Sequence, residues 1–245
     1  MSNFLASSLR AEPSIQTKMV EGSRYAAGIE SILHSHQYIQ NNKAPLYWRL
    51  SPYYLPQLTD SSCSLASATM IVNAVLSQQK LMTKRALATQ DEVLNRVNDN
   101  DWRNAVKQGG DGVTLVQLKT FLAKALEAYG IFNFELDLVQ LKGNSKRDEF
   151  SLRNLLMESE NTGTTFIIAN FNQKFFTGAM SVGHFSPIGA YDSKTKRALI
   201  LDTDRELYEP YWVPEKLLLD SMATFDNDAG LYRGYLVLRL LPTKV

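Results

Sequence analysis

Hydrophobic residues in the first half of the chain recur every three to four positions, the spacing of helices that bury one face. The clearest series follows a polar stretch and comprises Leu65, Ala68, Val72, Val75 and Leu76. We expect a helix of about 15 residues to begin near Cys63. Its N-cap is expected among Asp60, Ser61 and Ser62.

Four more segments in this half carry helical signals. Thr89–Glu92 has the pattern of a capping box and opens a short helix. Thr114–Gln117 opens another, with Gly130 as its stop. The apolar face of that helix comprises Leu115, Leu118, Phe121, Leu122, Ala125, Leu126 and Tyr129. Further helices are expected over Ser151–Glu160 and over Glu21–Gln40, the latter with apolar positions at Ala26, Ile29, Ile32 and Leu33.

The second half of the chain changes to strand-like patterning. Strands are expected over Thr165–Phe171, His184–Tyr191, Ala198–Asp204, Tyr232–Leu240 and Phe132–Leu138. Val213–Glu215 begins a further helix, with Pro214 in its first turn. Helices followed by a mostly antiparallel sheet indicate an α+β fold.

Composition narrows the classes of function. The 245 residues are 44% hydrophobic and 21% charged, as in a folded protein with a substantial core. A formal net charge of +1 indicates no affinity for nucleic acid, and no apolar run approaches the roughly 20 residues of a membrane span. The N-terminus lacks the pattern of a signal peptide, so we expect a cytoplasmic protein without nucleic-acid or membrane partners.

Cys63 is the single cysteine, which excludes an internal disulfide and zinc sites built from cysteine pairs. At the start of a helix, unpaired N–H groups and the positive end of the helix dipole lie near the side chain. Both favour the thiolate, which is the reactive form of cysteine. The alternative interpretation is a small residue buried in the core.

His184 is the candidate base among three histidines. It lies in a strand-like run and follows Cys63 by 121 residues, and papain-like enzymes have a similarly long interval. We expect it to take the thiol proton and later to protonate a leaving amine. His34 and His36 lie in a polar region and are expected to be solvated surface residues rather than metal ligands.

A third group should orient the imidazole. If the turn after Asp192 holds an odd number of residues, His184 and Asp202 share a face of the sheet, whereas an even turn separates them. Asp204 has the same parity, so periodicity does not distinguish it from Asp202. A strand-end cap or a surface carboxylate is the other interpretation of Asp202.

The segments around these residues resemble phytochelatin synthase, the glutathione γ-glutamylcysteinyltransferase family of the papain-like clan; they are residues 183–191, 201–205 and 208–214. The resemblance extends over about residues 45–241. It implies a papain-like fold, with the nucleophile at the N-terminus of an early helix packed on a mostly antiparallel sheet formed by the C-terminal half. We therefore expect an N-terminal arm or peripheral helix over residues 1–45 and a catalytic domain over residues 46–245.

The resemblance also implies roles for individual residues. It implies a triad of Cys63, His184 and Asp202, and glutathione as the substrate. It implies that Gln57, six residues before the nucleophile, serves the oxyanion hole together with the backbone N–H of Cys63.

Three charged residues match substrate-binding positions of similar bacterial enzymes. The resemblance implies that Asp226 pairs with the ammonium of the γ-glutamyl group and that Arg233 grips its carboxylate. Asp228 is an alternative to Asp226, and a surface acid and a strand-end base are the alternative interpretation of the pair. Arg205 also matches a basic position, where it contacts the substrate or braces Asp202.

The sequence departs from the family pattern in two ways. Ser62 and Ser64 flank the nucleophile, where the family usually has an aromatic residue and a glycine. Plant members carry an additional cysteine-rich C-terminal region that this sequence lacks, so we expect hydrolysis to γ-Glu-Cys to outweigh transfer to a second glutathione. The fold is expected to bind no cofactor itself; cadmium or zinc would enter as a metal–glutathione thiolate.

Two other functions and a homodimer are left open. One alternative is a papain-like peptidase or deamidase that acts on a protein, for which Arg233 would be dispensable. The other is a degenerate member that binds glutathione or metal thiolates without catalysis, for which Cys63 would be unreactive toward iodoacetamide near neutral pH.

Overall fold

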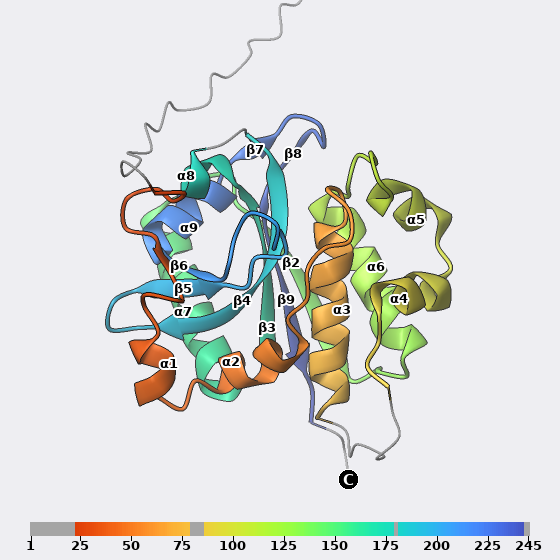
Figure 1. Ribbon diagram of the computed structural model, residues 1–245, viewed down its shortest axis with the longest axis horizontal. Coiled ribbons are helices and arrows are strands. Elements are labelled where there is room, and N and C mark those ends of the chain that lie inside the picture. The colour runs from red at the N-terminus through yellow and green to blue at the C-terminus, as the bar shows by residue number, and fades with distance from the viewer. Residues whose placement is uncertain (1–22, 79–85, 179–180, 243–245) are drawn as a thin grey trace, which may run out of the picture.

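The computed structural model describes residues 23–78, 86–178 and 181–242. A seven-stranded sheet with the order β1-β6-β5-β4-β3-β9-β2 forms its centre (Figure 1), and its strand pairings are antiparallel. β7 and β8 form a separate hairpin. The strands are β1 (Glu30–Ser31), β2 (Phe134–Gln140), β3 (Thr165–Asn172), β4 (Gly183–Asp192), β5 (Arg197–Ile200), β6 (Tyr211–Pro214), β7 (Phe225–Asp226), β8 (Leu231–Tyr232) and β9 (Gly234–Leu240).

Helices lie on both sides of this sheet, which gives the mixed α+β architecture that the sequence predicts. They are α1 (Gln37–Asn41), α2 (Pro45–Leu50), the 3-10 helix η1 (Ser51–Tyr53), α3 (Cys63–Leu76), α4 (Gln90–Val97), α5 (Asn100–Val106), α6 (Leu115–Ala128), α7 (Lys146–Thr162), α8 (Lys174–Thr177) and α9 (Glu215–Met222). Figure 1 shows α3 to α6 on one side of the sheet and α7 and α9 on the other.

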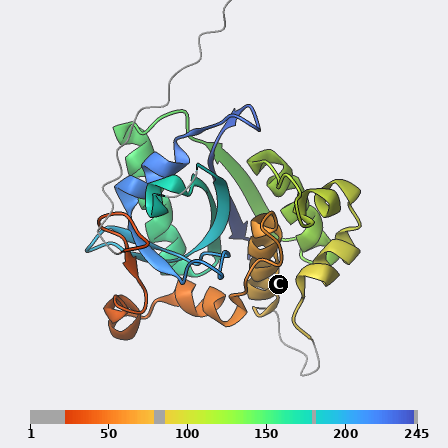
Figure 2. The ribbon, with the colours of Figure 1, turned by 45° about the horizontal axis from the view of Figure 1, so that its top comes forward.

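Alternate residues of the central strand β3 enter two different cores. Phe166 and Ile168 pack in a cluster with residues of α3 and α6. Ile167 and Phe171 pack in a second cluster with residues of α7 and α9. Figure 2 shows the strands curving between these two groups of helices. Because both faces are covered, every residue of β3 is buried.

The helix predicted from the first hydrophobic series is confirmed, and it begins at Cys63. All of its residues are buried, because α3 packs against β4 on one side and against α4 and α6 on the other. Ser62 takes the N-cap position, but its side chain makes no capping bond. Burial on all sides fixes the position of the helix start, and with it that of Cys63.

Capping chemistry predicted the helix starts well. Thr89 and Glu92 form both bonds of a capping box at α4. Thr114 is the N-cap of α6, which ends before Gly130 with its φ of 77°. The helix expected over Ser151–Glu160 is longer than predicted, because Ser145 caps α7 one turn earlier.

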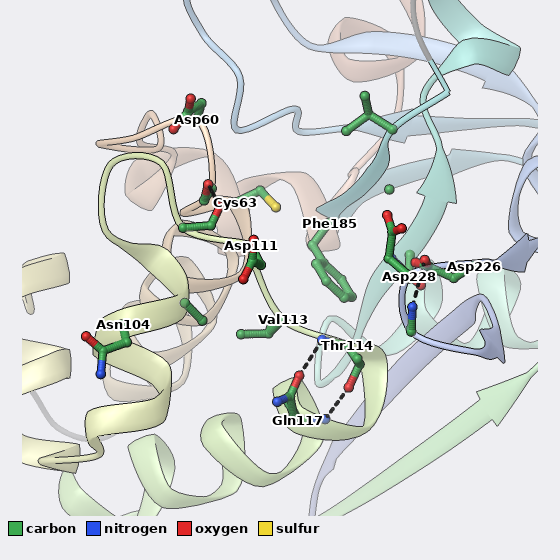
Figure 3. A pocket seen from close by; sticks show the side chains of 18 of the residues that line it. Asp60, Cys63, Asn104, Asp111, Val113, Thr114, Gln117, Phe185, Asp226 and Asp228 are labelled. Carbon is green, nitrogen blue, oxygen red and sulfur yellow. Dashed lines mark hydrogen bonds between the residues drawn. The ribbon is translucent and has the colours of Figure 1, made fainter.

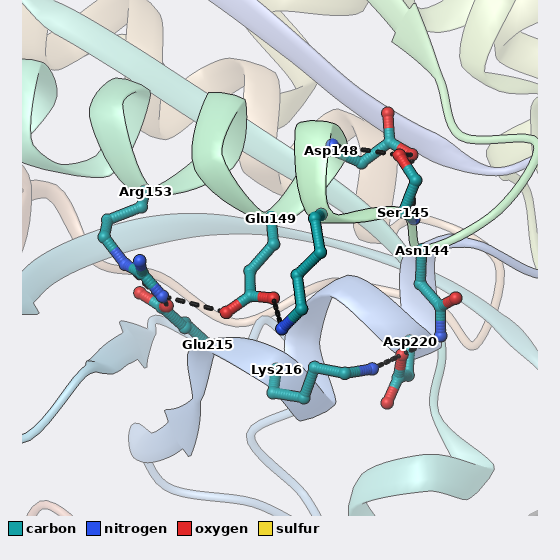
Figure 4. A network of polar contacts seen from close by, with 9 residues as sticks. Asn144, Ser145, Asp148, Glu149, Arg153, Glu215, Lys216 and Asp220 are labelled. Carbon is teal, nitrogen blue, oxygen red and sulfur yellow. Dashed lines mark hydrogen bonds and ion pairs between the residues drawn. The ribbon is translucent and has the colours of Figure 1, made fainter.

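Ion pairs join α7 and α9 on the side of the sheet away from α3 (Figure 4). Arg153 Nε of α7 donates to Glu215 Oε1 of α9 at 2.8 Å, and Arg153 Nη2 lies 3.0 Å from Glu149 Oε1. The Tyr191 hydroxyl of β4 donates to the other oxygen of Glu215. Through these contacts the helical layer is attached to the strand that carries His184.

The helix expected over Glu21–Gln40 is wrong in the described part of that range. β1 pairs with β6 there, and only the short helix α1 follows. Tyr25, Ala26 and Ile29 are buried in the second core cluster. The apolar spacing that suggested a helix face instead reflects separate contacts of a non-helical chain with the sheet.

Three predictions in the second half need correction. The strand expected over Ala198–Asp204 ends at Ile200, so Asp202 lies in the loop that follows it. The strand expected over Tyr232–Leu240 is interrupted at Arg233, between β8 and β9. Pro214 is the N-cap of α9 rather than part of its first turn.

Candidate active site

Cys63 lines a cleft between the helical part of the molecule and the sheet (Figure 3). It is the first residue of α3, and no side chain of the described residues caps this helix end. The N–H groups of the first turn therefore remain available beside the sulfur, at the positive end of the helix dipole. This environment favours negative charge on the sulfur or on a substrate oxygen next to it.

A buried histidine and a buried carboxylate lie next to Cys63. His184 Nε2 lies 2.8 Å from Asp202 Oδ1, and the ring is close enough to the Cys63 thiol to hydrogen-bond it. Because the carboxylate occupies Nε2, Nδ1 is the nitrogen left for the thiol. His184 is 5% and Asp202 0% exposed, so solvent does little to weaken their interaction.

The carboxylate of Asp202 is held from several sides. The Tyr211 hydroxyl donates to Oδ2 at 2.6 Å, and the backbone N–H of Asp204 donates to Oδ1 at 2.9 Å. The Tyr54 hydroxyl donates to the backbone carbonyl of Asp202. Asp202 rather than Asp204 is thus the carboxylate that meets His184, a choice that periodicity had left open.

The electrostatics of the pair follow from this geometry. Burial acts to lower the pKa of His184, but Asp202 and the Cys63 thiol outweigh it and hold that pKa well above its ordinary value. Burial acts to raise the pKa of Asp202, but His184 and the Tyr211 hydrogen bond keep it below its ordinary value. Both directions favour an imidazolium beside a carboxylate.

A β-bulge brings His184 and Asp202 to the same side. The turn between β4 and β5 consists of residues 193–196, and this even number predicts opposite faces in a regular register. The register shifts between Ile188 and Ala190, where β4 has one residue more than β5. The extra residue puts His184 and Asp202 on the same face of the sheet. The prediction that this requires an odd number of turn residues is therefore wrong, although the two side chains do lie together.

Gly189 lies at this bulge because a side chain would not fit. A Cβ there would stand 2.6 Å from Cγ of Leu201, the residue before Asp202. The bulge also marks a change of partner along β4. Residues 183–187 pair with β3, whereas residues 188–192 pair with β5.

The loop before α3 ties Gln57 to the triad region. Gln57 N donates to the Thr203 carbonyl at 2.8 Å, and its side-chain Oε1 accepts from the Thr203 hydroxyl at 3.3 Å. Thr203 directly follows Asp202 in the chain. With Oε1 engaged, the amide nitrogen of Gln57 is the end of the side chain that can donate to a ligand.

The two serines beside Cys63 have structural contacts. Ser62 Oγ accepts the backbone N–H groups of Leu58 and Thr59, both at 2.9 Å, and so fixes the loop that holds Gln57. Ser64 is fully buried and accepts a long hydrogen bond of 3.4 Å from Trp102 Nε1. Both side chains are therefore engaged away from the open cleft.

The cleft has a volume of about 820 Å³, within the range of small-molecule sites. In Figure 3, Cys63 and Asp226 stand on opposite sides with Phe185 between them. Arg233 Nη2 lies 3.2 Å from Asp226 Oδ2. Gly183 passes close by, since a Cβ on it would lie 3.3 Å from atoms of both residues. The structure thus places this ion pair in the same cleft as the thiol.

The remaining predicted residues lie as follows. Asp228 lines the cleft and is exposed. Arg205 is exposed and is not part of the cleft lining; its guanidinium stands 5.3 Å from the centre of the Tyr54 ring. Because Tyr54 contacts Asp202, the bracing interpretation of Arg205 fits its position better than substrate contact. His34 and His36 are exposed, as expected.

Sequence reasoning missed Tyr211 and Tyr54 as partners of Asp202. Tyr211 lies within one of the segments that carry the resemblance, which was the available signal. Tyr54 carried none, because its contact depends on a loop packing across the sheet. Over residues 23–78, 86–178 and 181–242, no group of three or more histidine, cysteine or acidic side chains is arranged to hold a metal ion. Within the same ranges no helix combines the length and the apolar character of a membrane span.

Comparison with known proteins decides the family. The phytochelatin synthase family model matches residues 26–235. The chain belongs to the phytochelatin synthase family. This match begins earlier than the resemblance read from the sequence, and it includes β1 with its contacts to the sheet.

Known relatives agree with this assignment. Glutathione gamma-glutamylcysteinyltransferase 1 of Arabidopsis thaliana is 26% identical over 239 residues, covering 97% of this chain and 44% of the relative. The enzyme of the same name from Triticum aestivum is 27% identical over 229 residues, covering 94% and 41%. Glutathione gamma-glutamylcysteinyltransferase of Schizosaccharomyces pombe is 26% identical over 208 residues, covering 82% and 45%. The chain therefore spans less than half the length of these relatives.

Proposed function

We propose that this chain cleaves glycine from glutathione and carries γ-Glu-Cys as a thioester on Cys63. The observation that carries the proposal is the buried His184–Asp202 pair beside the Cys63 thiol, in a cleft that also holds the Asp226–Arg233 pair. The names of the relatives, which specify glutathione as the γ-glutamylcysteinyl donor, support the same substrate.

The first half-reaction is acylation. The Cys63 thiolate attacks the carbonyl carbon of the cysteinyl–glycine bond and forms a tetrahedral oxyanion. The N–H of Cys63 and the side-chain amide of Gln57 donate to that oxygen. The His184 imidazolium then gives its proton to the glycine nitrogen, the C–N bond breaks, and glycine leaves.

The second half-reaction releases the acyl group. Water, or the amine of a second glutathione, attacks the thioester carbonyl and gives a proton to His184, and Cys63 leaves as a thiolate. Water yields γ-Glu-Cys, and the amine yields a phytochelatin. Cadmium or zinc would take part as a thiolate complex of the substrate.

Asp226 and Arg233 would hold the γ-glutamyl end. This group carries an ammonium and a carboxylate on one carbon, and an adjacent acid and base are complementary to both. Arg233 Nη2 and Asp226 Oδ2 lie 3.2 Å apart, so the two side chains are close enough to hold one such group between them. A protein substrate has no such free end.

Mass spectrometry of the intact protein mixed with glutathione tests the proposal. A γ-Glu-Cys adduct should form on Cys63, and it should form more slowly in Asp202→Asn, where the imidazolium that protonates the leaving glycine is less stable. Cys63→Ser is the control and should carry no thioester. Failure of the wild-type protein both to release glycine and to form the adduct would refute the function. Product analysis with and without cadmium or zinc then separates hydrolysis from transfer.

A further inference from the structure

Asn170 is a buried polar residue of the cleft to which the reaction described above gives no role. It lies on β3 and is 4% exposed, yet it contributes to the lining of the cleft. Its parity along β3 is that of Phe166 and Ile168, which pack in the core shared with α3. Asn170 therefore presents its carboxamide on the face of the sheet that packs against α3, the helix that begins with Cys63.

The hydrogen-bonding capacity of this carboxamide is largely unused. Nδ2 donates to the backbone carbonyl of His184 at 3.4 Å, a long hydrogen bond. Among the residues that the structure describes, Oδ1 has no hydrogen-bond partner. Because Asn170 lines the cleft, a ligand bound there can reach this carboxamide.

The strand register places Asn170 between the two groups that the donor substrate must reach. On one side it pairs with Phe185, which follows His184. On the other side it pairs with Gly234, which follows Arg233. A glutathione molecule that extends from Arg233 to the thiol must therefore cross Asn170, and the part in the middle is the γ-glutamyl amide.

We propose that Asn170 binds the γ-glutamyl amide of the donor, which makes it a specificity-determining residue for the γ-linkage. Oδ1 accepts the amide N–H, the hydrogen-bond donor of the γ-glutamyl linkage. In an α-linked isomer the amide lies two carbons closer to the ammonium-bearing carbon and does not meet Asn170. This inference rests on the proposed cleavage of glutathione.

The test compares glutathione with an analogue in which oxygen replaces the N–H of the γ-glutamyl amide. Wild type should prefer glutathione by about 10-fold in kcat/KM, the effect of one hydrogen bond whose loss leaves an acceptor unpaired. Asn170→Leu should reduce this ratio to near one. Asn170→Asp keeps the acceptor, so it should retain the preference although its overall kcat/KM falls.

Asn172→Leu is the matched control. Asn172 is also buried on β3 but donates to Ser181 at 2.7 Å and is outside the cleft lining, so the ratio should stay at the wild-type value. An equal ratio in wild type and Asn170→Leu would overturn the assignment. If Asn170→Leu does not fold, loss of the preference in Asn170→Asp would overturn it as well. Inability of wild type to cleave glutathione would instead refute the function itself.

Discussion

The two walls of the cleft are built in different ways. On the sheet wall, Asn170, Phe185 and Arg233 are 4%, 3% and 6% exposed, and they lie on or directly beside paired strands. On the helical wall, Asn104 and Lys107 are exposed, and Lys107 Nζ donates to Asn104 Oδ1 at 3.4 Å. Figure 3 shows Asn104 on this side, well away from Phe185.

The two walls should therefore contribute differently to substrate binding. Side chains on the sheet wall are held before a ligand arrives, so they can select one substrate geometry at little cost in conformational entropy. Side chains on the helical wall keep their rotamer freedom and are screened by solvent. Substitutions should therefore have large and specific effects on the sheet side and small effects on the helical side.

Asp202→Asn should have the largest effect, because it removes the carboxylate that supports the sheet side of the site. We expect kcat/KM for glycine release to fall by about 10²–10⁴-fold. Asp202 holds the pKa of His184 up, and the imidazolium is lost as pH rises through that pKa. The alkaline limb of the pH profile should therefore move to lower pH. Asp204→Asn, which leaves the backbone N–H in place, is the control; an unmoved limb in Asp202→Asn would contradict the assignment.

Arg233→Lys should have the next largest effect, since an ammonium cannot make the two parallel bonds of a guanidinium. We expect kcat/KM to fall by about 10–100-fold, mainly through KM. Arg239 on β9 pairs with Glu158 and is outside the cleft lining, so Arg239→Lys is the control and should leave both constants near wild type. A fall confined to kcat would show that Arg233 does not serve ground-state binding.

Ser62→Ala tests the loop where the two walls meet. Two backbone N–H groups lose their acceptor, which should lower the free energy of unfolding by about 1–3 kcal/mol. Displacement of Gln57 should lower kcat several-fold with little change in KM. Ser64→Ala removes only the long bond to Trp102 and is the matched control. Denaturant titration and steady-state kinetics measure the two effects, and equal behaviour of both variants would exclude a role for the loop contact.

Lys107→Gln should have the smallest effect. The side chain is exposed and makes no ion pair with the described residues, so we expect a change in kcat/KM of less than about threefold. A larger loss of kcat/KM that disappears at high ionic strength would contradict the expected difference between the two walls. It would place a charged part of the substrate on the helical wall.

Local signals in the sequence predicted much of the scaffold. Helix starts depend on interactions between residues a few positions apart. The capping residues before α4 and α6, and the apolar series after Cys63, could therefore be recognised in the sequence. Cys63 and His184 could be named as candidates from their positions in the chain, and the family resemblance selected Asp202 over Asp204. The structure brings the three together.

What the sequence did not predict depends on distant packing. The bulge at Gly189 packs closely against Leu201, a contact that the sequence does not reveal. Counting turn residues therefore gave the wrong condition for His184 and Asp202 to share a face. Asn170 lies within a run of buried residues, where nothing local marks it as facing a cleft. β1 is only two residues long and exists because β6 offers an edge.

The change of partner along β4 has a mechanical consequence. His184 belongs to the half of that strand bonded to β3, whereas Asp202 extends from β5, which bonds the other half. The 2.8 Å contact between them therefore links the two halves of the sheet. The hydrogen bond that would orient the imidazole for proton transfer also connects the two halves of the sheet. The stability of the sheet and turnover therefore depend on the same two side chains.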